Sequence, residues 1–477
     1  MSDRLFTPES LPAAGVGVFS LDEALPRSST LIEASAGTGK TFTLTHLAAN
    51  FIERDAVPIS QLLLVTYTRA AAGELRDRLR RVLRQRAATT TDTDASTRLR
   101  IAAEEFDTAT ITTIHGFCQQ VLTTLGVNVP LDPALKLLAD EETLITQIAA
   151  DLLAGQALAE STAEGTLPKL AKLTEAIRMG STHPGIVVAG HPDEPDHNRL
   201  AQLTTDGLDE LDRRLAARSL MTYQQLLNRV AAAVNGPKNS GVVDILRRRF
   251  RVALIDEFQD TDPVQWEVFR LLFAGGERAD SPTLVLVGDP KQAIYSFRGA
   301  DIATYLDAKQ VVERQRRLDR NWRSTPQLIA ALNSLFAGSR FGSSPDGAHT
   351  IGYDPVIAAR LSDGANDGHP ALTFRSFDMP AYQEVHPPEY QKNGKAIPTP
   401  IGLIRHLVGL DLVAQVRSTL AAGVRAEEIT VLVTSNKDAA RIQRLLAEAG
   451  LPAVLGRAGS VMDSPAADQI RRLLWAM

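Results

Sequence analysis

The sequence is poor in the residue types that build disulfide scaffolds, zinc sites and membrane spans. It has one cysteine, Cys118, among 477 residues, which excludes a disulfide framework and a multi-cysteine zinc site and fits a reducing compartment. It has no apolar run long enough to cross a membrane. The first ten residues, MSDRLFTPES, lack the apolar stretch of a signal peptide. We therefore expect a cytoplasmic protein that does not associate with membranes.

The sequence also lacks an excess of positive charge, because its formal net charge is −5. Contact with nucleic acid would therefore depend on local basic surface rather than on the field of the whole protein. Two basic runs occur, RDRLRRVLRQR at 76–86 and RRRFR at 247–251. Solvated helix faces are the commoner explanation for such runs.

The order of strand-like and helix-like segments predicts an α/β fold. The chain is too long for one hydrophobic core, so we expect two to four domains. Short apolar segments alternate with helical patterns, which predicts a parallel sheet. The expected strands are 29–34, 61–68, 108–115, 251–257 and 283–289. Residues 116–245 are rich in alanine and leucine and read as a helical insertion. A second α/β unit is expected from about Leu318, with strands at 371–377 and 428–435.

Residues 34–41, ASAGTGKT, fit the pattern of a phosphate-binding P-loop with alanine in place of its first glycine. A strand precedes the loop and a helix follows it, so backbone N–H groups and the helix N-terminus can surround a phosphate chain. Lys40 would reach the β- and γ-phosphates, and the Thr41 hydroxyl would ligate Mg²⁺. We expect ATP and Mg²⁺ as cofactors. The predicted nucleotide-binding residues of the loop are Ala34, Ser35, Ala36, Gly37, Thr38, Gly39, Lys40 and Thr41.

A second acidic motif, IDEFQDTD at 255–262, follows an apolar strand. Parallel sheets place ligands at the carboxyl ends of their strands, where Asp256 and Glu257 would lie. Asp256 can hold Mg²⁺, directly or through water, and Glu257 can orient and deprotonate the attacking water. The alternative, two surface acids at a strand end, is disfavoured by the upstream P-loop.

Six motifs occur in one order along the chain. They are ASAGTGKT, LLLVTYTRAAAGELRDRL, ITTIHGFCQQVL, IDEFQDTDPVQWEVF, LVGDPKQAIYSFRGAD and LDRNWRSTPQLI. This order resembles the superfamily 1 DNA helicases of the UvrD/Rep type and, among them, the RecB family of exodeoxyribonuclease V beta subunits. The resemblance implies two RecA-like parallel-sheet motor domains, the first with a helical insertion and the second incomplete. The implied segments are 1–115 and 246–317 for the first motor domain, 116–245 for the insertion and 318–477 for the second motor domain.

The resemblance also implies roles around the nucleotide. Gln292 matches the glutamine that senses the γ-phosphate, and Arg323 matches an arginine that neutralises charge on the transferring phosphoryl group. Trp322 stands where the family stacks an aromatic ring on the adenine, although it could instead pack under Arg323.

Further positions match the family's DNA contacts. They are Thr66, Arg69, His115, Phe117, Tyr295, Phe297 and Arg298. Tyr295 and Phe297 would lie near unstacked bases, and stacking on aromatic rings tolerates any base sequence. Two alternatives stay open here: Phe117 could be a core residue, and Thr66 could be an ordinary strand residue. The short loop from Gln292 to Tyr295 would pass changes at the nucleotide to the DNA.

The implied function is an ATP-dependent 3′–5′ DNA helicase or translocase of double-strand-break repair and recombination. Its implied partners are single-stranded or duplex-end DNA and RecC-like and RecD-like subunits. We find no TVHKSKGLE-like segment, no later arginine-bearing helix and no nuclease region, so we expect the N-terminal portion of such a motor. The alternative is an ATP- and DNA-binding fragment or remnant with little hydrolysis or unwinding of its own. A non-motor P-loop enzyme is disfavoured by Tyr295, Phe297 and the NWRS segment.

Overall fold

The chain forms two compact units, residues 1–372 and residues 373–477. The computed structural model describes residues 16–125, 135–138, 140–158, 166–182, 188–191, 193–235, 240–274, 281–293, 302–343, 350–360, 370–386, 400–456 and 465–476. None of the helices in these ranges combines the length and the hydropathy needed to cross a lipid bilayer. The unit boundary falls after residue 372, whereas the segment boundaries at 115, 245 and 317 stay predictions.

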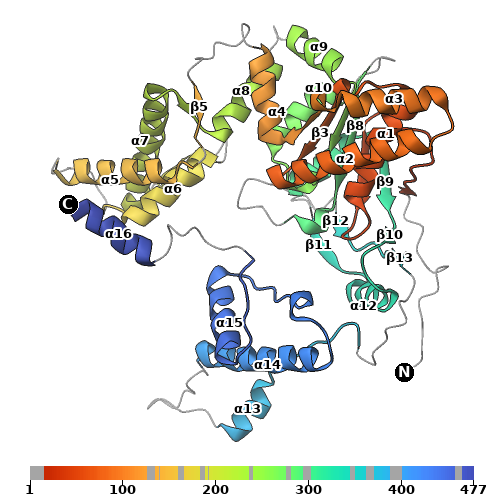
Figure 1. The fold of residues 1–477 in the computed structure, drawn as a ribbon. Coiled ribbons are helices and arrows are strands. Elements are labelled where there is room, and N and C mark those ends of the chain that lie inside the picture. Colours follow the sequence, from red (N-terminus) through yellow and green to blue (C-terminus); the bar gives the residue numbers. More distant parts are fainter. Residues whose placement is uncertain are drawn as a thin grey trace. The chain divides into compact units, whose positions relative to one another are not determined.

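The first unit is built around a seven-stranded sheet in which every strand pair is parallel (Figure 1). In spatial order its strands are β1 (Gly17–Val18), β9 (Arg314–Leu318), β2 (Thr30–Ala34), β8 (Thr283–Gly288), β7 (Val252–Ile255), β3 (Leu62–Thr66) and β4 (Thr110–Thr113). The predicted α/β fold with a parallel sheet is therefore confirmed.

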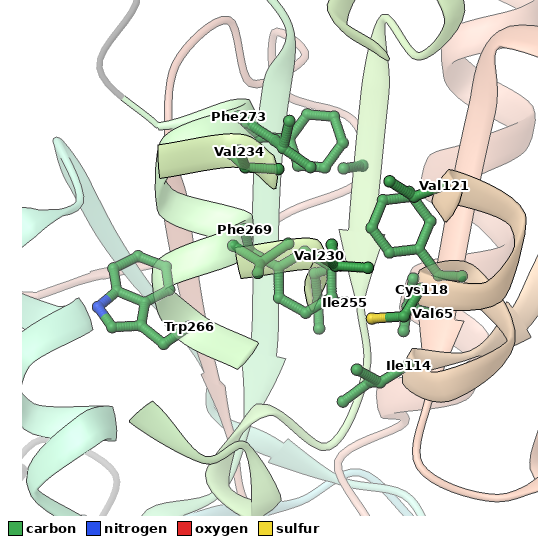
Figure 2. Packing of buried hydrophobic residues seen from close by; sticks show 14 of the residues in the cluster. Val65, Ile114, Cys118, Val121, Val230, Val234, Ile255, Trp266, Phe269 and Phe273 are labelled. Atoms are coloured by element: carbon green, nitrogen blue, oxygen red, sulfur yellow. The ribbon is translucent and has the colours of Figure 1, made fainter. Parts of the chain in front are cut away.

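Helices cover both faces of this sheet, and alternate strand residues point to opposite faces. Leu62 and Leu64 of β3 pack against α1 (Lys40–Asp55), α2 (Arg69–Thr89) and α3 (Thr93–Glu104). Leu63 and Val65 join the opposite core, which Figure 2 shows around Cys118. The helices on that side are α4 (Ile114–Leu125), α8 (Tyr223–Asn235), α9 (Ser240–Arg249), α10 (Pro263–Phe273) and α11 (Ile302–Val311). Because both faces are buried there, the central strands β3, β7 and β8 are apolar along most of their length, whereas β9 (RQRRL) near the sheet edge is not.

Helix α3 begins at Thr93, within the threonine- and aspartate-rich segment 89–97, a composition that is also typical of a loop. The Asp92 side chain caps the helix by accepting hydrogen bonds from the N–H groups of Asp94 and Ala95. Leu99 then anchors it in the core. The start of the helix is rich in threonine and aspartate, which are also common in turns, so the capping role was not distinguishable from a loop signal.

Three helices between α4 and α8 form a separate core. They are α5 (Glu142–Leu158), α6 (Leu170–Thr182) and α7 (Pro195–Ala217). The short strands β5 (Lys136–Leu137) and β6 (Leu220–Met221) pair in parallel beside them. The region of the predicted insertion is mostly helical, but α4, α8 and α9 pack on the sheet rather than with this separate core.

The chain leaves β9 and forms a small group of elements that borders the P-loop. Strand β10 (Arg320–Asn321) pairs in parallel with β13 (Ile357–Ala358). Helix α12 (Pro326–Phe336) follows β10 and begins at the cap residue Thr325. Strands β11 (Arg340–Ser343) and β12 (Thr350–Gly352) form an antiparallel pair.

The second unit is helical in its described residues. Its helices are α13 (Met379–Val385), α14 (Ile401–Ala421), α15 (Asn436–Glu448) and α16 (Pro465–Ala476). Val413 of α14 packs with Ile442 and Leu446 of α15. The strands predicted at 371–377 and 428–435 do not form, because neither segment has a neighbouring strand to pair with in the described part of the chain. Leu432 is accordingly 90% exposed.

Candidate functional site

The P-loop has the backbone geometry of an anion-binding turn. It joins β2 to α1, and its glycines adopt the left-handed region, with φ of +78° at Gly37 and +91° at Gly39. Gly39 is the N-cap of α1 and provides no side-chain cap, so the first N–H groups of the helix keep their hydrogen-bonding capacity. Thr38 closes the turn by donating from Oγ1 to the Ser35 carbonyl at 2.7 Å. This arrangement suits phosphate oxygens.

The segment after β9 holds the P-loop from outside. Asn321 donates from Nδ2 to the Ala36 carbonyl at 2.8 Å, and the Trp322 N–H donates to the Gly37 carbonyl at 2.8 Å. The side-chain oxygen Oδ1 of Asn321 accepts from the N–H of Arg323 at 3.0 Å. The predicted residues Trp322 and Arg323 are therefore positioned beside the loop, although they follow it by more than 280 residues.

Five residues close a ring of hydrogen bonds behind the P-loop. Lys40 donates from Nζ to Oε2 of Glu257 at 2.7 Å and contacts Oε1 of Gln292 at 3.4 Å. Gln259 donates to the same Glu257 oxygen at 2.8 Å and accepts from the Asp289 N–H at 2.9 Å. Gln292 donates to Asp289 at 2.6 Å, which completes the ring. Three of the predicted catalytic residues thus meet at one point.

The acidic motif adds two buried carboxyl groups beside this ring. Burial and the neighbouring charge of Glu257 raise the pKa of Asp256 to about 7 and that of Asp260 to about 6. A buried carboxyl group whose ionisation is this unfavourable suits a bound cation, which would stabilise the charged form. Asp256 follows β7 directly and Thr41 is the second residue of α1, and their role as Mg²⁺ ligands stays a prediction. Glu257 has a φ of +50°, which turns the chain sharply after Asp256.

Two exposed aromatic side chains flank the start of α1. Trp322 is 62% exposed and Phe42 is 54% exposed. A Cβ atom placed on Gly39 would lie 3.8 Å from Cβ of Phe42 and 3.9 Å from Cδ1 of Trp322. Phe42 in turn stacks on His46, with ring centroids 3.9 Å apart. Two exposed rings beside the same glycine can contact a flat group such as a nucleobase.

A hollow of about 500 Å³ lies beside α2 and α4. Arg69, Arg76, His115 and Gln119 line it, together with Tyr223 at the start of α8. The His115 ring contacts the Tyr223 ring edge-on at 4.8 Å, and burial lowers the pKa of His115. The hollow therefore combines arginine cations with a neutral imidazole and a phenol ring, which is a lining suited to single-stranded nucleic acid.

The other predicted DNA contacts lie elsewhere. Phe117 is fully buried and stacks on Phe269 with ring centroids 5.8 Å apart. It therefore lies as a core residue, which was the alternative, and not where its ring could contact DNA directly. Thr66, at the end of β3, is also fully buried. Tyr295, Phe297 and Arg298 lie outside the described residues.

Comparison with known proteins is consistent with this geometry. The sequence profile of the UvrD/REP helicase N-terminal domain matches residues 22–313, more than half of the chain. The chain belongs to the UvrD/REP helicase family. The P-loop, the DEFQD motif and the GDPKQ motif all lie within the matched residues.

Relatives within the UvrD/REP helicase family are RecB subunits. The chain is 34% identical to the RecBCD enzyme subunit RecB of Mycolicibacterium smegmatis over 94% of its own length and 42% of the relative's. It is 33% identical to the Mycobacterium tuberculosis subunit over the same shares and 27% identical to the Escherichia coli subunit, of which it covers 50%. The RecB-like character is thus confirmed, and the chain spans half or less of these relatives' length.

Sequence reasoning missed three residues of the UvrD/REP site. Gln259 and Asp289 complete the hydrogen-bonded ring, and Asn321 holds the P-loop. Each stands inside a motif that had been recognised, DEFQD, GDPKQ and NWRS. For Asp289 the available signal was an acid directly after a buried strand, because such positions gather at the edge of a parallel sheet. Gln259 and Asn321 carried no such signal.

Proposed function

We propose that this chain is the motor portion of a RecB-like DNA helicase, which couples ATP hydrolysis to 3′–5′ movement along single-stranded DNA. The proposal includes double-strand-break repair as its setting and RecC-like and RecD-like subunits as its partners. The observation that carries it is the meeting of Lys40, Glu257 and Gln292, one residue from each of three motifs. A purely structural ion pair would not need the third residue.

The contacts of Lys40 suggest how the nucleotide site would work. Phosphate oxygens would compete with Glu257 for the Lys40 ammonium group, because both are anionic acceptors. Glu257 released in this way would orient the attacking water and accept its proton. Arg323, whose guanidinium forms no ion pair with another described residue, would stabilise charge on the transferring phosphoryl group. Mg²⁺ held by Thr41 and Asp256 would neutralise part of the phosphate charge.

Movement along DNA would depend on the link between Gln292 and the residues that follow it. Gln292 ends the short helix η6 (Pro290–Gln292), directly after β8 and Asp289. Tyr295 follows three residues later, so a changed contact at Gln292 would shift the proposed base-stacking rings. The hollow at Arg69 and His115 would hold the strand during this step. We propose Trp322 and Phe42 as the two walls of the adenine site.

One feature of the second unit favours an alternative. Its described residues contain no strand, so they provide no parallel-sheet edge of the kind that carries Lys40 and Glu257 in the first unit. The alternative is an ATP- and DNA-binding module with little hydrolysis of its own.

The test is the ATPase activity of the 477-residue chain with and without single-stranded DNA, compared with a Lys40→Ala variant. The motor proposal requires phosphate release that DNA stimulates and that Lys40→Ala reduces by at least about a hundredfold. Binding of a fluorescent ATP analogue is measured in parallel. Binding without turnover above the Lys40→Ala level would support the module, and no nucleotide binding would contradict both.

A further inference from the structure

The edge of the central sheet opposite the P-loop has two hollows, which we call the amino-edge hollows. The first, of about 610 Å³, lies where α1 ends and β7 and β8 begin, and Asp55, Val252 and Thr283 line it. The second, of about 600 Å³, lies beside the starts of β3 and β4, at Gln61 and Thr110. Arg248 lines both hollows, so they adjoin each other at this side chain.

This surface contains arginines that have no partner in the described part of the chain. Arg248 and Arg251 are both exposed, and neither forms an ion pair or a side-chain hydrogen bond with a described residue. Arg27 is already paired with Asp55 at 2.6 Å. Arg249 donates to the Thr124 hydroxyl at 3.0 Å. Two cations thus remain available, Arg248 between the two hollows and Arg251 in the first.

The common structural explanation, a basic residue that stabilises a helix C-terminus, applies to Arg247 and Arg248 in the last turn of α9 but not to Arg251. The Arg247 side chain is also engaged by α10, because it donates to the carbonyls of Leu271 and Leu272 at 2.9 Å each. Arg251 lies outside any helix. Its N–H donates to Gln61 at 3.0 Å and its carbonyl accepts from Thr283 at 2.8 Å, so the backbone holds it rigidly between two strands.

The remaining lining suits phosphate groups. Hydroxyl and amide side chains surround the arginines, namely Ser60, Gln61, Thr108, Thr110, Gln120 and Thr283. Asp107 is paired with Arg80 at 2.9 Å, and Asp244 is the remaining acid. Phe51 is an aromatic lining residue, and it is buried, so it offers no ring to a base. Such a surface can contact a sugar–phosphate backbone and offers no exposed ring on which a base could stack.

We propose that the amino-edge hollows are a second DNA-binding site, which holds the phosphodiester backbone through Arg248 and Arg251. This inference rests on the proposed function in one respect, which is that the bound phosphodiester polymer is DNA. A protein partner would be expected to use an apolar anchor pocket, whereas the apolar lining residues Phe51, Val57 and Val252 are buried.

The experiment measures the salt dependence of DNA binding by the full chain in the absence of nucleotide. Fluorescence anisotropy with a labelled duplex, and separately with a labelled single strand, gives the slope of log Kobs against log salt concentration. This slope is negative, and each lost phosphate contact reduces its magnitude by about 0.9 for a duplex and about 0.7 for a single strand. In the Arg248→Ala/Arg251→Ala variant the magnitude of the slope should fall by about 1.8 with the duplex or by about 1.4 with the single strand. The variant should also bind that DNA roughly ten- to a hundredfold more weakly at 0.1 M salt. Whichever DNA, duplex or single strand, shows the changed slope is the form that binds at this edge of the sheet.

A matched control replaces two exposed arginines of the other basic run, Arg81→Ala/Arg84→Ala on α2, and should retain the original slope. The Arg248→Lys/Arg251→Lys variant should also retain it, because lysine keeps the charge. If the alanine variant folds poorly by circular dichroism, Arg248→Gln/Arg251→Gln replaces it. An unchanged slope with both DNA forms would overturn the inference, and intact DNA-stimulated ATP hydrolysis in that variant would show that the motor proposal stands apart from it.

Discussion

The Lys40 ammonium group lies 2.7 Å from a carboxylate oxygen of Glu257, a residue 217 positions further along the chain. The contact joins the cation expected to bind phosphate to the carboxylate expected to activate water. Both partners are partly buried, so water screens their attraction only in part. If Lys40 binds phosphate as proposed, phosphate binding would release the Glu257 carboxylate from this ion pair.

Replacing Glu257 by glutamine tests this competition. The Glu257→Gln variant should bind a fluorescent ATP analogue at least as tightly as the original chain, because Lys40 loses its anionic partner. Its ATP hydrolysis should fall by about 10²–10⁴-fold, since the proton acceptor is lost. Nucleotide titration and phosphate-release assays measure the two effects, with the exposed Glu104→Gln on α3 as a control. Weaker nucleotide binding would contradict the competition.

The raised pKa of Asp256 predicts a pH dependence of Mg²⁺-dependent nucleotide binding. With a pKa of about 7, the carboxyl group is mostly protonated at pH 6 and mostly ionised at pH 8, and only the ionised form attracts a cation. The Mg²⁺-dependent part of the affinity should rise by about tenfold over this range. Titrations of a fluorescent ATP analogue at both pH values measure it. In Asp256→Asn the two titrations should coincide, and a pH dependence of equal size in that variant would exclude Asp256 as its source.

The same group predicts how stability changes with pH. Because burial raises the pKa of Asp256, the folded state holds the proton more tightly than the unfolded state. The resulting stabilisation is complete below pH 4 and is lost as the pH rises towards 7. Asp256→Asn should therefore melt close to the original chain at pH 4 and higher at pH 8, by up to about 4 kcal/mol in unfolding free energy. Thermal melts of Asp77→Asn, an exposed position on α2, should show no such trend.

Gly37 is expected to tolerate no side chain. Its φ is +78°, and an added Cβ would lie 2.6 Å from Nδ2 of Asn321, which holds the loop. Gly37→Ala should cost about 1–3 kcal/mol and weaken nucleotide binding by more than tenfold. Gly73→Ala, on α2 with open space around it, should be neutral or stabilising by about 0.5–1 kcal/mol. Denaturant melts and nucleotide titrations of both variants would show whether the effect is specific to the loop.

Phe117 and His115 should separate folding from DNA binding. Phe117→Ala removes a fully buried ring and should destabilise the first unit by about 3–5 kcal/mol. His115→Ala changes a partly exposed residue of the hollow and should lower affinity for single-stranded DNA, with a much smaller effect on stability. Melting curves and DNA titrations on both variants give the comparison. If Phe117→Ala kept its full stability but bound single-stranded DNA more weakly, Phe117 would have to be a DNA-contacting residue.

The nucleotide site could be predicted from the sequence because parallel strands end at a shared edge. Lys40 follows β2, Glu257 follows β7 and Gln292 follows β8, so strand order alone brings them close together. The bonds made by Gln259 depend on the conformation of the turns after two strands, which apolar patterns do not specify. Asn321 was missed because its role is a contact with backbone carbonyls, which any segment of the chain could have supplied.

Two other sequence-based predictions were wrong because tertiary packing overrode the local sequence pattern. Phe117 stands in a motif that matches DNA contacts, yet α4 turns that position towards the sheet, where a large apolar ring is most stable. Residues 428–435 have a strand composition but no partner strand among the described residues, and strand propensity depends on that partner.

Strand β2, which carries the P-loop, pairs only with β8 and β9, and both are made more than 250 residues later. A ribosome that adds about 5–20 residues per second would therefore expose this apolar segment for roughly 12–50 seconds before its neighbours emerge. Until then the nascent chain has no complete nucleotide pocket, and the unpaired strand is open to wrong association. Strand β2 is thus made before its neighbours β8 and β9 but can pair only after they are made. This order predicts that the nascent chain needs chaperone protection during translation.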